Sequence, residues 1–229
     1  MKRYLTIVLA IVLCLGSSVG ATSTNIRSAK CAEMVESDAS SNFGSTATNQ
    51  LGNYAVSDTR NPIMAFDISG LPVGQTINSA TLWLYNISEL AVGSFDAEVA
   101  AIRRVWVETE VTWNVYSTGN SWTTGGAENT TSDRYTPEDT STVSDVDSVS
   151  WDVTDMVTNW YNSTWTNNGL MINPVDAPAT EWWVFHSDDA VTEAYRPNLV
   201  VDYSAPAAGS TTVVVKGVWQ NNGVGKCGD

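Results

Sequence analysis

Cations are scarce in this sequence. The 229-residue chain has 11 Lys and Arg against 25 Asp and Glu, and removing a leader that carries Lys2 and Arg3 takes the formal net charge from −14 to −16. Such a surface repels phosphates, so we expect no nucleic-acid partner, and it repels polyanionic glycans unless a divalent cation bridges them. His186 is the only histidine, which excludes a zinc site built from several imidazoles, and the chain has no nucleotide-binding glycine motif.

Long apolar runs are also missing. The run from Tyr4 to Leu15 is shorter than the roughly 20 residues of a membrane-spanning helix. It follows two cations and ends in small residues, with Val19 and Ala21 placed for cleavage. Residues 1–21 are therefore predicted to be a signal peptide, and we expect a protein without a membrane span that is secreted, extracellular or at the cell surface.

Only two cysteines remain after the leader, Cys31 and Cys227. Outside the cytosol they could form one disulfide that joins the two ends of the chain. The alternatives are two unpaired thiols or pairing with another chain. Glycosylation-type triplets, which also arise by chance in a chain rich in Ser, Thr and Asn, begin at Asn86, Asn129 and Asn162.

Short alternating runs between turn residues dominate the rest of the sequence. In "ATLWLY", Ala80, Leu82 and Leu84 share one face and Trp83 lies on the other. Period-two runs of this kind predict strands of an antiparallel β-sandwich, each with one buried face. The predicted strands lie at 64–68, 80–85, 95–101, 149–153, 169–172, 181–186 and 198–203.

One segment has a different period. In "DVTDMVTNWYN", residues 152–162, the apolar residues recur at the spacing of one helical stripe, and Asp152 is placed to cap its start. We therefore predict one short helix. Residues 114–148 are polar, with little periodicity, and loops this long in compact domains are usually functional or disordered. Residues 205–229 read as a linker and a C-terminal tail.

Five segments together resemble the DNRLRE domain family, named after disaggregatase-related repeats. They are "NFG" at 42, "RNPIMAFDISGLPVGQTINSATLWLY" at 60, "VWVETEVTWN" at 105, "WDVTDMVTNWYNSTWTNNGLMI" at 151 and "RPNLVVDY" at 196. The resemblance implies a secreted, all-β sandwich of jelly-roll type, from a family that includes carbohydrate-binding modules and has no shared catalytic residues. It places the domain at 33–204, with residues 22–32 as an N-terminal extension.

Glu108 and Glu110 lie two residues apart between Trp106 and Trp113. On an extended strand they would share a face, with Cβ atoms about 7 Å apart, and their carboxyl groups could approach the spacing of a retaining glycosidase. They could instead be ligands of a structural calcium ion. The interpretation that we favour is structural: the two tryptophans anchor a bend, and the carboxylates accept hydrogen bonds or face water.

All ten tryptophans lie beyond the predicted leader. Sugars stack their C–H faces on flat rings, but tryptophans also fill protein cores, and a contiguous exposed patch would mark an interaction site. A competing possibility is that the long loop covers Trp83 and Trp182. Four tryptophans lie opposite buried neighbours or in loops and are the candidate carbohydrate-binding residues: Trp83, Trp122, Trp165 and Trp182.

Three functions are consistent with these features. The first is a secreted, non-catalytic module that binds a polysaccharide or cell-surface glycan, without a certain cofactor. The second is a structural or adhesive subunit of a surface layer or extracellular fibre, which would self-associate. The third is a polysaccharide-cleaving enzyme that uses Glu108 and Glu110. We expect the first.

Overall fold

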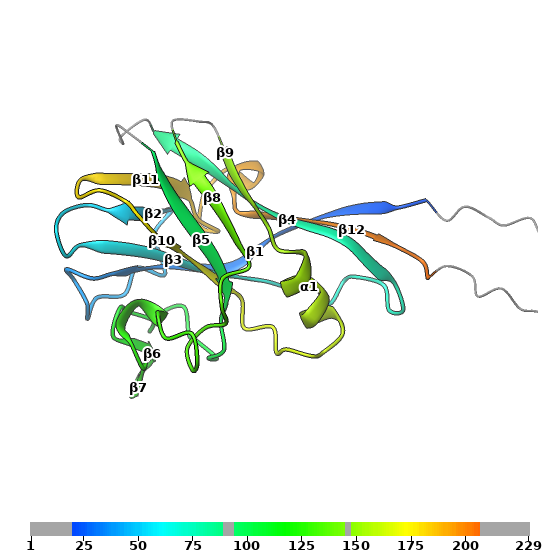
Figure 1. Cartoon of the computed structure of the whole chain (residues 1–229), viewed down its shortest axis with the longest axis horizontal. Coiled ribbons are helices and arrows are strands. Elements are labelled where there is room, and N and C mark those ends of the chain that lie inside the picture. The colour runs from blue at the N-terminus through cyan, green and yellow to red at the C-terminus, as the bar shows by residue number, and fades with distance from the viewer. Residues whose placement is uncertain (1–19, 89–93, 145–147, 207–229) are drawn as a thin grey trace, which may run out of the picture. The chain divides into compact units, whose positions relative to one another are not determined.

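The structure is a computed structural model that describes residues 20–88, 94–144 and 148–206. Within these ranges the chain forms antiparallel strands, one short α-helix and two 3-10 turns (Figure 1). The strands are β1 (Thr22–Val35), β2 (Thr48–Asn53), β3 (Thr59–Phe66), β4 (Thr76–Ser88), β5 (Phe95–Ala101), β6 (Val115–Ser117), β7 (Asn120–Ser121), β8 (Asp139–Val143), β9 (Ser148–Asp152), β10 (Leu170–Pro174), β11 (Glu181–His186) and β12 (Asn198–Ser204). The helical elements are α1 (Thr154–Tyr161), η1 (Gly125–Ala127) and η2 (Glu193–Tyr195).

Six strands form a closed ring in the order β1, β12, β4, β11, β2 and β3, because β1 also pairs with β3. From β3 the sheet continues through β10 and β5 to β8, and β9 pairs with β4. The mostly β, antiparallel architecture with one short helix is therefore confirmed. The closure of the ring was not predicted, since alternation within one strand says nothing about which strands pair.

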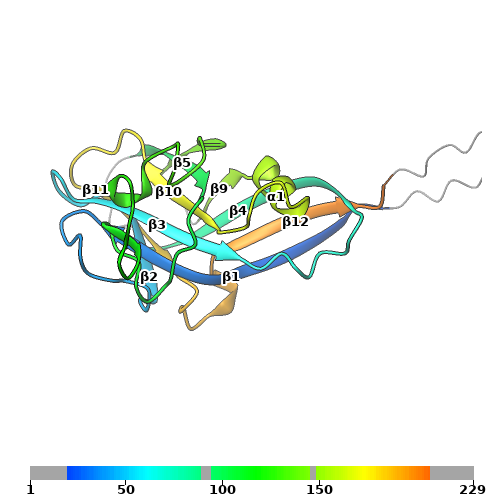
Figure 2. The ribbon, with the colours of Figure 1, turned by 90° about the horizontal axis from the view of Figure 1, so that it is seen from below.

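Closure depends on β1, which belongs to two ladders. Its first half pairs with β12, from Thr22 opposite Tyr203 to Arg27 opposite Asn198. After a register shift between Ser28 and Lys30, its second half pairs with β3. Figure 2 shows β1 as one long strand beside β12. Residues 22–32, which the sequence analysis assigned to an N-terminal extension, make up most of β1.

The main core lies inside the ring and under α1. It includes Leu82, Trp151, Trp160, Trp183 and Phe185, all of them buried. The apolar stripe of α1 faces this core as predicted, since Met156, Val157 and Trp160 are its buried residues.

A second core lies on the other face of β1, β3 and β10. Ala32, Met34, Ile63 and Met171 pack there against Trp106 and Trp122 of the segment 103–135. Figure 1 shows this segment, with β6 and β7, below β3 and β10. Strands covered on both faces read as continuous apolar runs, which explains why the second half of β1 showed no alternation.

Candidate functional site

Glu108 and Glu110 lie in a turn and not on an extended strand. The backbone N–H groups of Glu110 and Val111 both donate to the carbonyl of Val107. Glu108 Oε1 accepts a hydrogen bond of 2.8 Å from the N–H of Cys31, and Glu110 Oε2 accepts one of 2.7 Å from the N–H of Thr118. The premise that the two carboxylates share one strand face is wrong, and each holds a backbone group of a different segment.

The tryptophan that precedes this turn anchors it. Trp106 is 1 % exposed, and its indole N–H donates to the carbonyl of Asn168 at 2.8 Å. Lys30 Nζ lies 3.7 Å from the Trp106 ring centroid and donates to the Trp106 carbonyl. Burial raises the pKa of Glu108 above its usual range, while the N–H of Cys31 opposes that rise. No group of three His, Cys, Asp or Glu side chains in the described ranges could hold a metal ion.

Asp133 holds the backbone of the segment that follows this turn in the sequence. Its side chain is buried, and Oδ2 accepts hydrogen bonds from the N–H groups of Thr123 and Thr124 at 2.7 and 3.0 Å. Trp122 is thereby held against the second core with 5 % of its surface exposed, and its indole N–H donates to the carbonyl of Thr112. The prediction that Trp122 lies on a binding surface is therefore wrong, because its long polar loop folds into a layer of its own.

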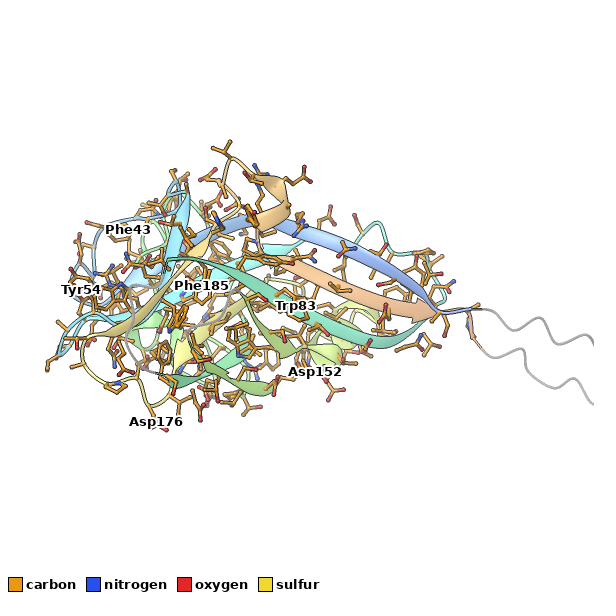
Figure 3. All side chains as sticks on the ribbon, turned by 90° about the horizontal axis from the view of Figure 1, so that it is seen from above. Phe43, Tyr54, Trp83, Asp152, Asp176 and Phe185 are labelled. Atoms are coloured by element: carbon orange, nitrogen blue, oxygen red, sulfur yellow. The ribbon has the colours of Figure 1, made fainter. Side chains whose placement is uncertain are left out.

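Trp83 and Trp182 are both partly exposed, and neither is among the residues of the second core, where Trp122 of the long loop packs. Trp83 lies on β4 between Ser150 of β9 and Asn198 of β12, on the outer face of the sheet (Figure 3). Trp182 packs against Tyr54 with ring centroids 4.4 Å apart. No ring contact joins the two tryptophans within the described part of the chain, so they do not form one aromatic patch.

Trp165 is the candidate that faces a cleft. Its ring stacks on Tyr135 with centroids 3.8 Å apart and 19° between the planes, and the Arg103 guanidinium lies 3.6 Å from the Tyr135 ring centroid. Trp165 lines a cleft of about 350 Å³ together with Glu138, Asp155 and Asn159. A second cleft, of about 440 Å³, shares Glu138 and Asp155 with the first. We call the two clefts the acidic trough, whose charged and aromatic lining is Trp165, Glu138, Asp139, Asp152 and Asp155.

Backbone contacts bring three separate segments to the trough. The N–H of Tyr135 donates to Ala101 at the end of β5, which places the segment 135–138 beside that strand. The N–H of Trp165 donates to the carbonyl of Asn159, which returns the chain to α1. These two contacts place the backbone of the lining segments beside β5 and α1.

Carboxylates hold the first turn of α1. The two oxygens of Glu138 accept from the N–H groups of Asp155 and Met156 at 2.7 and 2.8 Å, where the helix leaves its first donors without partners. The predicted cap, Asp152, accepts from the N–H of Thr154. Burial, with the nearby charges of Asp155 and Asp152, raises the pKa of Glu138 to about 7 despite the two N–H groups.

Asp155 and Asn159 present polar groups to the trough. They lie one helical turn apart, and the Asn159 amide donates to the carbonyl of Asp155 at 2.8 Å. The Asp155 carboxylate has no hydrogen bond or ion pair within the described ranges. The sequence analysis missed both residues, although their i, i+4 spacing on the polar side of the predicted helix was a usable signal.

The predicted disulfide and glycosylation sites stay predictions. Cys31 is buried with 2 % exposed, and Cys227 lies outside the described residues. Asn162 is exposed at the end of α1, whereas Asn86 and Asn129 are partly buried. Most of the predicted signal peptide and most of the predicted tail also lie outside the described ranges.

Comparison with known proteins supplies the family. The described ranges contain no helix that is long and apolar enough to cross a membrane. No curated protein matches the chain. The family of the Disaggregatase related repeat domain matches residues 32–201, which takes in β2 to β11, α1 and the acidic trough, with the end of β1 and the start of β12. Because this match spans most of the chain, the protein belongs to the disaggregatase related repeat domain family.

Proposed function

We propose that this protein is an exported, non-catalytic module that binds carbohydrate in the acidic trough. One observation carries the proposal: a half-buried indole, Trp165, lines the same cleft as the Asp155 carboxylate and the Asn159 amide. Ligand sites are typically concave, with an aromatic lining and a few polar groups that set orientation. A sugar ring has C–H faces for the indole and hydroxyl donors for the carboxylate.

The indole of Trp165 is fixed before any ligand arrives. Tyr135 covers one of its faces, and Arg103 in turn covers Tyr135. A ring held in this way loses little freedom on binding, and that saving favours affinity. Trp122 is buried, whereas Trp165 is half-buried and lines a cleft, so among the candidate tryptophans we place the glycan site at Trp165.

The test is a titration of the purified protein with soluble polysaccharides and oligosaccharides, followed by tryptophan fluorescence and calorimetry. We expect binding by the natural chain and loss of at least about tenfold in affinity for Trp165→Ala, an amount that corresponds to about 1.4 kcal/mol. Trp182→Ala is the matched control, since it removes an indole of similar exposure outside the trough. Circular dichroism checks that both variants fold.

Two outcomes contradict the proposal. If no glycan binds to the natural chain, with and without calcium, the function is wrong. If Trp165→Ala binds as tightly as the natural chain, the site is wrong. The enzyme alternative has its own test, since Glu108→Gln would abolish any cleavage that used this carboxylate.

The proposal also includes export of the protein and a jelly-roll arrangement of its strands. β1 begins at Thr22, directly after the predicted cleavage site at Ala21, which fits a folded chain that starts there. N-terminal sequencing of the protein from culture medium tests this, and a retained leader would contradict it. The family resemblance supports a jelly-roll assignment for the strand order, which an experimental structure would test.

A further inference from the structure

The lining of the acidic trough includes the carboxylates of Asp139, Asp152 and Asp155. Glu138 lies beside them, but its raised pKa of about 7 leaves it mostly uncharged at about pH 6. Within the described ranges, the ion pairs use other acids: Glu33, Asp58, Glu98 and Asp133. Like charges that share one cleft repel one another, so a cation that entered it would relieve their repulsion.

Arg103, the cation in the aromatic stack, does not line the trough. Arg103 and Trp165 both lie within 4 Å of the Tyr135 ring centroid, at 3.6 and 3.8 Å. Two groups at such distances must occupy opposite faces of the ring. Arg103 is therefore separated from Trp165 by the thickness of the tyrosine, and it points its charge at the stack and not at the carboxylates.

A metal ion does not fit this arrangement. A divalent cation needs several oxygen ligands that converge on one point. The part of the chain that the structure describes has no group of three acidic, His or Cys side chains able to hold a metal ion. The trough carboxylates are spread along two adjoining clefts, which suits a ligand whose positive charges are spread along its length.

The indole of Trp165 adds a second reason for a cationic ligand. An ammonium group is attracted to the face of an aromatic ring, most strongly to that of tryptophan. An ammonium group also makes charge-assisted hydrogen bonds to carboxylates, which are shorter and stronger than neutral ones. A sugar that carries an amine can use both contacts at once, with its ring on Trp165 and its ammonium group on Asp155.

We propose that the acidic trough selects an oligosaccharide that carries primary ammonium groups over the same oligosaccharide in neutral form. The proposal rests on the proposed function, because it names the ligand class of the same site. It excludes uronic-acid and sulfated glycans as ligands of the trough, since their charges have the same sign as its lining.

The probes are a glucosamine hexamer and its fully N-acetylated form, which share one backbone and differ in charge. Titrations run at about pH 6, where most amines of the first probe are protonated. We expect the glucosamine hexamer to bind at least about tenfold more tightly than the acetylated one at low salt, and this advantage to shrink at about 0.5 M NaCl as charges are screened.

Two variants assign the effect to the trough. Asp155→Asn and Asp152→Asn keep the shape of each side chain and remove its charge, and the new amide oxygen at 152 can still accept from the N–H of Thr154. Each is expected to weaken binding of the glucosamine hexamer about three- to tenfold and to leave the acetylated hexamer unchanged. Asp176→Asn is the control, because Asp176 is exposed in the turn before β11 and lies far from Asp152 in Figure 3.

The outcomes separate the two proposals. If the acetylated hexamer binds as tightly as the amine form, or if neither trough variant changes the preference, the selection of ammonium groups is refuted while carbohydrate binding stands. If the natural chain binds neither hexamer but binds another neutral glycan through Trp165, the ligand class is likewise refuted. If it binds no glycan of any class, both proposals fail together.

Discussion

Removal of the Asp133 carboxylate should unfold the second core before the first. This side chain is 0 % exposed, and Oδ2 accepts the N–H groups of Thr123 and Thr124. Its contact with Arg104 Nε is longer, at 3.4 Å, and that arginine side chain is 36 % exposed. The two backbone hydrogen bonds therefore account for most of its contribution.

The magnitude follows from those two bonds. A hydrogen bond to a charged group contributes about 1.5–3 kcal/mol, and a buried donor left without a partner costs a similar amount. Asp133→Ala should lower the free energy of unfolding by about 3–5 kcal/mol. Asp133→Asn retains an oxygen at the same place without the charge, so we expect a loss of about 1–2 kcal/mol.

The assay is urea unfolding followed by circular dichroism and by tryptophan fluorescence, with limited proteolysis of the segment 103–135. Asp189→Ala is the control, because Asp189 is exposed and such changes usually stay within about 0.5 kcal/mol. The reasoning is refuted if Asp133→Ala unfolds within about 1 kcal/mol of the natural chain, or if the alanine and asparagine variants are equally stable.

Three further predictions concern the framework. Gly44→Ala should lower stability by about 1–3 kcal/mol, because a Cβ there would overlap the carbonyl oxygen of Glu108; an unchanged melting temperature would contradict it. Deleting residues 22–27 removes the ladder between β1 and β12 and should lower the free energy of unfolding in urea by about 2–4 kcal/mol. An unchanged unfolding midpoint would show that the domain is equally stable without these residues. Burial raises the pKa of Glu33 from 4.5 to about 7, so the folded state binds its proton more tightly and stability should fall as pH rises through this interval, by at most about 3 kcal/mol. Glu33→Gln should flatten that dependence in unfolding curves at several pH values, and a slope of the opposite sign would show that the carboxylate form is the favoured one.

Four of the strands that the sequence predicted correctly have one buried face. β4, β5, β9 and β12 alternate because each has core on one side and solvent on the other, and that pattern is local to the strand. β1 was not predicted, and the reason is the opposite one. Its first half is polar, and residues 31–35 are buried on both faces, so no alternation remains to be read.

Periodicity and composition were enough to determine that this chain is mostly β, antiparallel and acidic, with one helix whose apolar stripe faces the core. Only the tertiary structure decided which polar and aromatic residues stabilise a loop or line the trough. Asp133 and Trp122 are buried because a loop without periodicity folds over the sheet. Trp165 lines one cleft with Glu138 and Asp155 because β5, α1 and the chain after α1 converge. These are contacts between residues distant in sequence, and no local pattern encodes them.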